Sequence, residues 1–170
     1  MRPSSIFVTI LATATAAAAD LVNVLRRADA PGEPLIEKFA WPRASEVTGV
    51  DTSQYLRSPA KASGGTFSCT TKPGPNRVGC GNSIAVWSEF VDDKNQLHVP
   101  ANSCTSVTKE CCRTVVCATK ADLDVPLGEA TGRMWNPLMI RCVLPGQGGV
   151  WQADDENMVV QVEYPRKGSC

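Results

Sequence analysis

Hydrophobic and polar positions alternate most regularly near the C-terminal end of the chain. Over residues 158–164 an apolar side chain occupies every second position, which is the pattern of a half-buried β-strand. An acidic turn at residues 154–157 separates this stretch from the mostly apolar residues 150–153. The pattern therefore predicts a β-hairpin over residues 150–164.

Two more apolar stretches predict strands. Residues 83–91 carry apolar side chains on both faces of an extended chain, as expected for a strand that is covered on both sides. A polar turn at residues 92–95 and the stretch 96–100 complete a second predicted hairpin. Residues 138–144 predict a further strand.

The main helix is predicted over residues 106–119. Val107, Cys111 and Val115 recur there at helical spacing and would share one face. The stretch 122–133, which contains a proline and two glycines, is expected to be a loop. Together these patterns predict an α+β protein, in which one main helix accompanies a small, disulfide-rich antiparallel sheet.

The chain contains eight cysteines, an even number. In an oxidising compartment they are expected to pair as four disulfides, although eight cysteines allow 105 pairings and the pairing stays open. The neighbours Cys111 and Cys112 are too constrained to bond each other, so each is expected to reach a different element. The predicted disulfide cysteines are Cys69, Cys80, Cys104, Cys111, Cys112, Cys117, Cys142 and Cys170.

The N-terminal end predicts targeting and processing. Residues 1–19 combine a short basic start, an apolar run and small residues that end at Ala19, which is the layout of a secretory signal peptide. Arg26 and Arg27 form a dibasic pair of the kind that secretory proteases cut, so residues 20–27 are expected to be a pro-peptide; two solvated arginines are the alternative. No stretch approaches the roughly 20 apolar residues of a transmembrane helix, so we expect secretion.

The next stretch, residues 28–65, contains no cysteine and is rich in proline, glycine, alanine and serine. This composition predicts an extended arm or linker. Leu35, Ile36, Phe39 and Trp41 interrupt its polar character. They are expected to dock on the domain, because burial of large apolar groups is favourable; a short recognition segment is the alternative. The disulfide-stapled domain would then cover residues 66–170.

Charge excludes two classes of partner. The formal net charge is zero, and 14 basic and 16 acidic side chains remain outside residues 1–27. Nucleic-acid binding needs a basic surface that replaces counterions on phosphates, and binding to anionic membranes needs a basic cluster. We therefore expect neither nucleic acid nor membrane as a partner.

Signatures of catalysis are missing from the sequence. His98 is the only histidine, which excludes two-histidine nuclease sites and the HExxH zinc motif. The serine-hydrolase motif GxSxG and the CxxC spacing of zinc sites do not occur either. We expect no catalytic residue, no metal ligand and no cofactor, and interpret His98 as a half-exposed strand residue.

Four residues form the candidate ligand surface: Trp135, Trp151, Asp122 and Asp124. Both tryptophans border predicted loops, where their rings could stack on sugars. The two aspartates could serve as a glycan-cleaving pair of carboxylates. The alternative for each residue is ordinary packing or a solvated turn.

The order of signal peptide, dibasic site, cysteine-free arm and disulfide domain resembles that of secreted cysteine-rich effectors of plant-pathogenic fungi. Within it, residues 81–84, residues 104–111 and residues 160–164 before Cys170 are similar to the smut-virus killer-toxin family. That resemblance implies a small α/β sandwich that is toxic to competing fungi or acts on a host. The chain departs from the family in the longer spacing between the first two pieces and in its fewer cysteines, so no functional residue is carried over.

A second set of residues is similar to barwin-like double-psi barrels. It comprises Cys80 with Gly81, Ile84, Val86, Val99, Cys104, residues 123–125 and the ending at residues 162–164 with Cys170. The resemblance implies a closed β-barrel with a carbohydrate-binding groove, in which residues 104–117 would be an insertion. A barwin-like barrel is thus the alternative fold.

These observations lead to one expected function and two alternatives. We expect a secreted, monomeric, non-enzymatic effector or toxin-like protein of a plant-associated fungus. It would bind a host or competitor protein or cell-surface component and so promote virulence or modulate host defence or cell death, with later entry into host cells left open. The alternatives are a carbohydrate-binding or carbohydrate-active wall protein, with polysaccharide as partner, and a structural wall protein.

Overall fold

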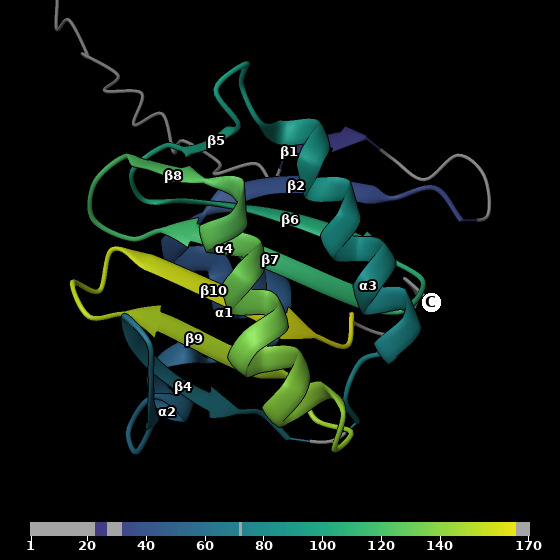
Figure 1. Ribbon diagram of the computed structural model, residues 1–170, viewed down its shortest axis with the longest axis vertical. Coiled ribbons are helices and arrows are strands. Elements are labelled where there is room, and N and C mark those ends of the chain that lie inside the picture. Colours follow the sequence, from purple (N-terminus) through teal and green to yellow (C-terminus); the bar gives the residue numbers. More distant parts are fainter. Residues whose placement is uncertain (1–22, 27–31, 72, 166–170) are drawn as a thin grey trace, which may run out of the picture.

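The computed structural model describes residues 23–26, 32–71 and 73–165, and it has the α+β architecture that the sequence predicts. An eight-stranded sheet has the order β1-β2-β6-β7-β10-β9-β4-β3, and β5 and β8 form a separate two-stranded ribbon (Figure 1). The strands are β1 (Asn23–Arg26), β2 (Leu35–Ala40), β3 (Ala60–Ala62), β4 (Gly65–Cys69), β5 (Gln96–Val99), β6 (Ser103–Lys109), β7 (Cys112–Ala118), β8 (Leu123–Pro126), β9 (Gly149–Ala153) and β10 (Met158–Glu163). Every strand pair is antiparallel. Because the main sheet ends in two edge strands, the closed barrel proposed as the alternative fold is not found.

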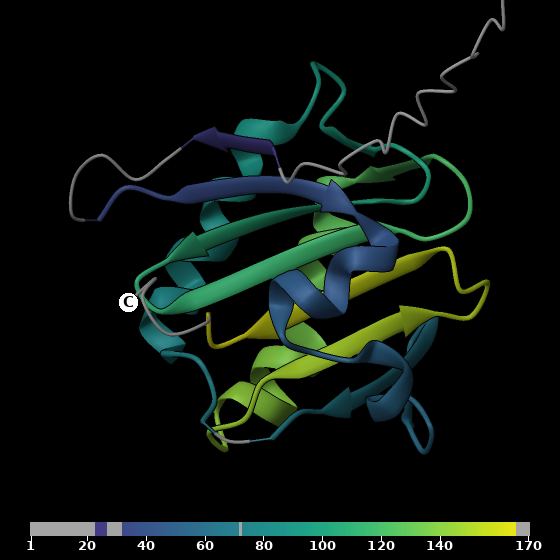
Figure 2. The same ribbon diagram turned by 180° about the vertical axis from the view of Figure 1, so that it is seen from behind.

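Helices cover both faces of the main sheet. The face seen in Figure 1 carries α3 and the long helical segment that begins with α4, and the face seen in Figure 2 carries α1 and α2. The helical segments are η1 (Trp41–Arg43), α1 (Ala44–Thr48), α2 (Thr52–Tyr55), α3 (Arg77–Ala85), η2 (Val86–Phe90), α4 (Leu127–Arg133) and η3 (Met134–Val143). The sheet is therefore the middle layer of three.

Two hydrophobic cores lie on opposite faces of the sheet. On β7, Val116 belongs to the larger core with Ile84 and Trp87, whereas its neighbour Val115 belongs to the smaller core with Val50. This follows from strand geometry, because successive side chains point to opposite faces. β7 and β10 are consequently buried at every position.

The predicted C-terminal hairpin is confirmed. β9 pairs with β10, with Trp151 opposite Val160. The expectation that the last strand is half-buried is wrong, because helices cover both of its faces and even Gln161 and Glu163 are buried. These two polar residues occupy the face below α1 and α2.

The predicted main helix over residues 106–119 is wrong. This stretch forms most of the β6–β7 hairpin, in which Cys104 lies opposite Cys117, and the turn residues Glu110 and Cys111 have positive φ. The chain here is rich in valine and threonine, whose β-branched side chains favour strands over helices. The apolar spacing that suggested a helix arises because both faces of this hairpin are covered.

The prediction of a strand over residues 83–91 is also wrong, because nearly all of these residues are helical, in α3 and η2. The side chain of Asn76 accepts hydrogen bonds from the backbone N–H groups of Val78 and Gly79 and so begins α3. Ile84 and Trp87 then lie one turn apart on the face that packs on the sheet. The predicted strand 96–100 does exist, as β5, but its partner is β8.

Two further predictions between residues 122 and 144 are wrong. The expected loop 122–133 contains β8 and α4, and the expected strand 138–144 lies largely in η3. Pro126 is the N-cap residue of α4, where a missing backbone N–H breaks no helical hydrogen bond. Proline therefore marks a helix start here.

The arm expected over residues 28–65 is not a separate element in the structure. β2 is an inner strand of the sheet, between β1 and β6. The predicted docking of its apolar residues is confirmed for Ile36 and Phe39, which are buried in the two cores. The β3–β4 hairpin crosses the expected boundary at residue 66, so residues 32–65 belong to the same domain.

Three disulfides join described residues. Cys80–Cys112 ties α3 to β7, Cys104–Cys117 bridges β6 and β7, and Cys69–Cys142 ties β4 to η3. The expectation that Cys112 bonds a partner other than its neighbour is confirmed. Cys111 is also disulfide-bonded, and Cys170 lies outside the described residues.

The targeting predictions fall mostly outside the described residues. The signal peptide with Ala19, and Arg27 of the dibasic pair, are not among them, whereas Arg26 is the last residue of β1. Within the described ranges, no helix combines the length and apolar character needed to cross a membrane.

Candidate functional site

A cavity of about 450 Å³ opens beside the β3–β4 hairpin, at one edge of the sheet, against the helical segment α4–η3. Its walls come from distant parts of the chain, because η3 packs against both β4 and β9. The lining residues are Ala60, Lys61, Ala62, Ser63, Phe67, Arg133, Asn136, Pro137 and Arg141. We call this cavity the basic pocket, because three of its residues are basic and no aspartate or glutamate of the described chain lines it.

Two consecutive glycines allow one wall of the basic pocket to form. A Cβ atom on Gly65 would lie 2.7 Å from Cζ2 of Trp151, so only glycine lets the indole pack beside β4. Gly64 has a φ of +68°, which favours glycine. It also leaves room for Arg133, because a Cβ atom on residue 64 would lie only 3.1 Å from Nη2 of that arginine. The turn between β3 and β4 therefore accommodates a stack of Arg133 on Trp151.

The guanidinium of Arg133 lies over the indole of Trp151, with 4.9 Å between its Cζ atom and the ring centroid. An arginine over an aromatic face is attracted by the ring quadrupole. Trp151 is only 1% exposed, so it forms a fixed floor beneath the charged group. This arrangement holds the guanidinium at the wall of the pocket.

A break in the helical segment shapes the opposite wall. Asn136 has extended backbone angles inside η3, and the peptide bond between it and Pro137 is cis. Both residues line the pocket together with Arg141 from the next turn. Arg133, Pro137 and Arg141 are spaced four residues apart. Residues with this spacing share one face of a helix, so a helix prediction for this stretch would have grouped them.

The residues predicted as a ligand surface do not come together at this pocket. Trp151 is buried beneath Arg133, so its ring is not open to a sugar. Trp135 is 46% exposed and lies near Gly81 of α3. Asp122 accepts a hydrogen bond from the backbone N–H of Ala101, whereas Asp124 contacts His98.

His98 lies between two carboxylates on the β5–β8 ribbon. It is paired with Asp124 across the ribbon, and the two side chains are 2.5 Å apart between Nδ1 and Oδ1. Its Nε2 atom lies 3.2 Å from Oδ2 of Asp92, whose other oxygen accepts the backbone N–H groups of Lys94 and Gln96. Because carboxylates engage both ring nitrogens, the imidazole has no free nitrogen with which to accept a proton from a substrate.

Both carboxylates affect the titration of His98. The hydrogen bond with Asp124, and next the one with Asp92, raise the pKa of His98 above its ordinary 6.5. The backbone hydrogen bond from Gln96 is the main cause that lowers the pKa of Asp92. In its protonated form His98 can donate to both carboxylates and so close the ribbon.

We expect this closure to weaken with rising pH. Since folding raises the pKa of His98 above 6.5, its stabilising contribution is complete below pH 6.5 and is lost as the pH rises through the higher folded value. An NMR titration of the His98 ring protons should give a pKa above 6.5, and Asp124→Asn should bring it down. A wild-type pKa at or below 6.5 would contradict the arrangement.

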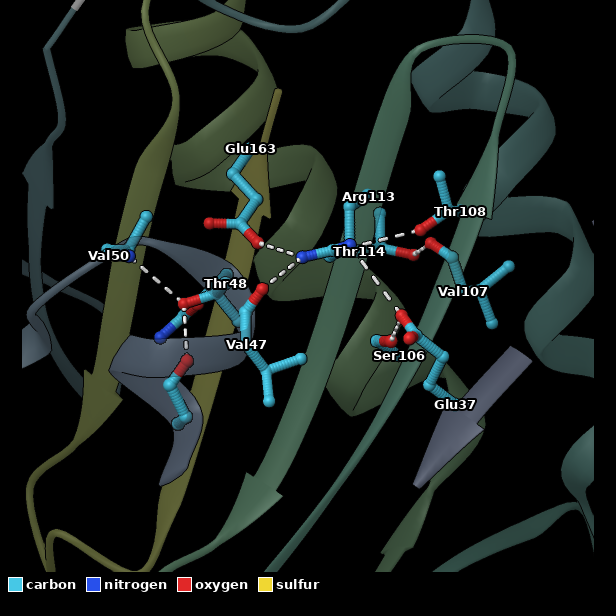
Figure 3. Close-up of polar contacts among 12 residues, drawn as sticks. Glu37, Val47, Thr48, Val50, Ser106, Val107, Thr108, Arg113, Thr114 and Glu163 are labelled. Carbon is cyan, nitrogen blue, oxygen red and sulfur yellow. Dashed lines mark hydrogen bonds and ion pairs between the residues drawn. The ribbon is translucent and has the colours of Figure 1, made fainter. Parts of the chain in front are cut away.

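A second cluster of charged groups lies largely buried beneath α1 (Figure 3). Arg113 of β7 is 4% exposed and lies 3.6 Å from a carboxylate oxygen of Glu37 and 3.6 Å from one of Glu163. It also donates to the carbonyl of Val47 at 2.8 Å and to the hydroxyl of Thr108 at 3.2 Å. The cluster links β2, β6, β7 and β10 to α1 and is largely buried, so we interpret it as part of the fold.

No group of three or more histidine, cysteine, aspartate or glutamate residues in the described part of the chain is arranged to hold a metal ion. The basic pocket, a cavity of about 450 Å³ with three basic side chains at its wall, is the candidate ligand site. Comparison with protein-family models, with curated proteins and with solved structures finds no match to this chain.

Proposed function

We propose that the protein is a secreted, non-enzymatic effector or toxin-like protein that binds a host or competitor target, with the basic pocket as its ligand site. The observation that carries the proposal is this pocket, a preformed cavity of about 450 Å³ with three basic side chains at its wall. Preformed cavities of a few hundred Å³ are typical of sites for small ligands.

Two further features support a binding role. Two disulfides join helical segments to strands of the sheet. Disulfides persist in oxidising environments such as the outside of the cell. The only histidine of the chain, His98, is engaged by carboxylates on both ring nitrogens and is remote in sequence from the pocket residues. Its arrangement favours a role in closing the β5–β8 ribbon over a role as a general base.

The test is activity of the purified secreted protein on living targets. We expect infiltration into leaf tissue to change ion leakage or defence responses, or addition to fungal cultures to slow growth. The double variant Lys61→Gln/Arg141→Gln should lose most of the response, because it removes two of the three pocket charges. Trp135→Ala, which changes an exposed ring that does not line the pocket, should keep it.

Three outcomes would count against the proposal. A lack of response in both leaf and fungus would overturn the effector or toxin-like role. Equal responses to the wild type and the pocket variant would remove the pocket as its site. Strong retention on polysaccharide that Trp135→Ala abolishes would favour the carbohydrate-binding alternative.

A further inference from the structure

The side chain of Arg133 indicates which ligand the basic pocket takes. Its Nε atom is buried and has no hydrogen-bond partner among the described residues. One face of the guanidinium is stacked on the indole of Trp151. Buried polar groups in proteins are normally hydrogen-bonded, so a donor left in this state at a pocket wall points to an acceptor that binds there.

The geometry of arginine restricts which chemical groups can serve as that acceptor. A guanidinium carries five N–H donors in a planar fork that matches the two oxygens of a carboxylate or a phosphate. Stacking on Trp151 and the confined space beside Gly64 restrict the rotation of this fork. A pre-oriented fork loses less conformational entropy on binding than a free side chain does.

Neighbouring charges add to this preference. Arg141 lines the same pocket, and so does Lys61, whose present partner is Asp154 at 3.2 Å. Both members of that ion pair are largely exposed, and exposed pairs of this kind contribute little to stability. Lys61 can therefore turn toward an anionic ligand at small cost, and the three cations together attract one.

The rest of the lining is apolar or small. Phe67 and Pro137 offer a ring and a proline surface, and Ala60 and Ala62 of β3 add methyl groups. We infer that the basic pocket binds a small organic oxyanion, whose carboxylate or phosphate contacts Arg133 and Arg141 and whose apolar body lies against Phe67 and Pro137. The inference deepens the proposed function, since it names the ligand class of the same site.

The experiment is an NMR titration of the full secreted protein with three aromatic probes. Benzoate and phenyl phosphate carry the two forms of oxyanion, and benzyl alcohol is their neutral analogue. We expect saturable shifts of the Arg133 Nε–H resonance with at least one of the two anions, and which of them binds more tightly tells carboxylate from phosphate. Benzyl alcohol should bind at least tenfold more weakly, and added salt should weaken only the anions.

Three variants locate the site and test its geometry. Arg141→Gln should weaken the preferred anion about tenfold, which corresponds to roughly 1.4 kcal/mol. Arg133→Lys keeps the charge but removes the planar fork, so it should weaken binding at least as much. Lys94→Gln, which removes an exposed charge from the turn before β5, should leave the affinity unchanged. Thermal unfolding of each variant checks that the fold is intact.

The inference is overturned if no probe binds, if benzyl alcohol binds as well as the anions, or if Lys94→Gln weakens binding as much as Arg141→Gln. These results are separable from a failure of the proposed function. If no oxyanion binds while Lys61→Gln/Arg141→Gln abolishes the tissue response, the pocket is the functional site for another kind of ligand. If oxyanions bind and the protein has no biological effect, the ligand class stands and the effector role falls.

Discussion

Replacement of Arg113 by methionine is expected to lower the free energy of unfolding by about 3–5 kcal/mol, because breaking a buried ion pair by removing one of its members is strongly destabilising. The change would leave the Glu163 carboxylate, which is in a residue only 2% exposed, beside an apolar side chain. It would also remove the donor to the carbonyl of Val47. Urea denaturation followed by circular dichroism measures the difference.

Two comparisons make this result specific. Lys120→Met removes one partner of the exposed pair with Glu156 and should cost at most about 1 kcal/mol. The double variant Arg113→Met/Glu163→Leu should be more stable than Arg113→Met alone, because it also removes the buried carboxylate. If Arg113→Met costs no more than Lys120→Met, then the cluster beneath α1 does not hold the strands together.

Removal of the Cys80–Cys112 disulfide is expected to have a comparable effect. The bond closes a loop with a sequence separation of 32 residues, and loss of such a constraint on the unfolded chain costs roughly 3–4 kcal/mol. The double variant Cys80→Ala/Cys112→Ala should therefore unfold at lower temperature and give a lower secreted yield. Thermal unfolding and the amount of protein in the culture fluid report the two effects.

The matched control is Cys104→Ala/Cys117→Ala. Its bond joins directly opposed residues of the β6–β7 hairpin, with a separation of only 13 residues, so its entropic contribution is smaller, about 3 kcal/mol. A greater loss for this control than for Cys80→Ala/Cys112→Ala would show that loop closure does not set the order of the two effects.

The fold class and the C-terminal hairpin could be predicted from the sequence, but several elements could not. A stretch that is apolar on two faces is compatible with a covered strand or with a helix on the core. Residues 83–91 are helical where the pattern predicts a strand, and residues 106–119 form strands where it predicts a helix, because both stretches carry buried apolar side chains at closely spaced positions. What distinguished them was local chemistry, namely the Asn76 cap before α3 and the β-branched residues of β6 and β7.

The candidate site was harder to predict than the fold. Lys61 lies far in the sequence from Arg133 and Arg141, and it shares a pocket with them only because η3 packs against β4. The exposure of the tryptophan side chains could not be predicted either, because a tryptophan ring can stack on a sugar at the surface or pack in a hydrophobic core. Trp151 proved to be the floor beneath Arg133, and Trp135 proved to be exposed.

The third disulfide has a consequence for where the protein can hold its ligand. Cys69 ends β4, two residues after Phe67, and Cys142 follows Arg141 in η3, so the Cys69–Cys142 bond clamps together two walls of the basic pocket. The centre of the sheet has its own disulfides and does not depend on this clamp. Glutathione and thioredoxin keep thiols reduced in the cytosol. In a copy of the protein that crossed into such a compartment, reduction of Cys69–Cys142 would remove the covalent link between these two walls, so we expect the proposed ligand to bind there more weakly than outside the cell.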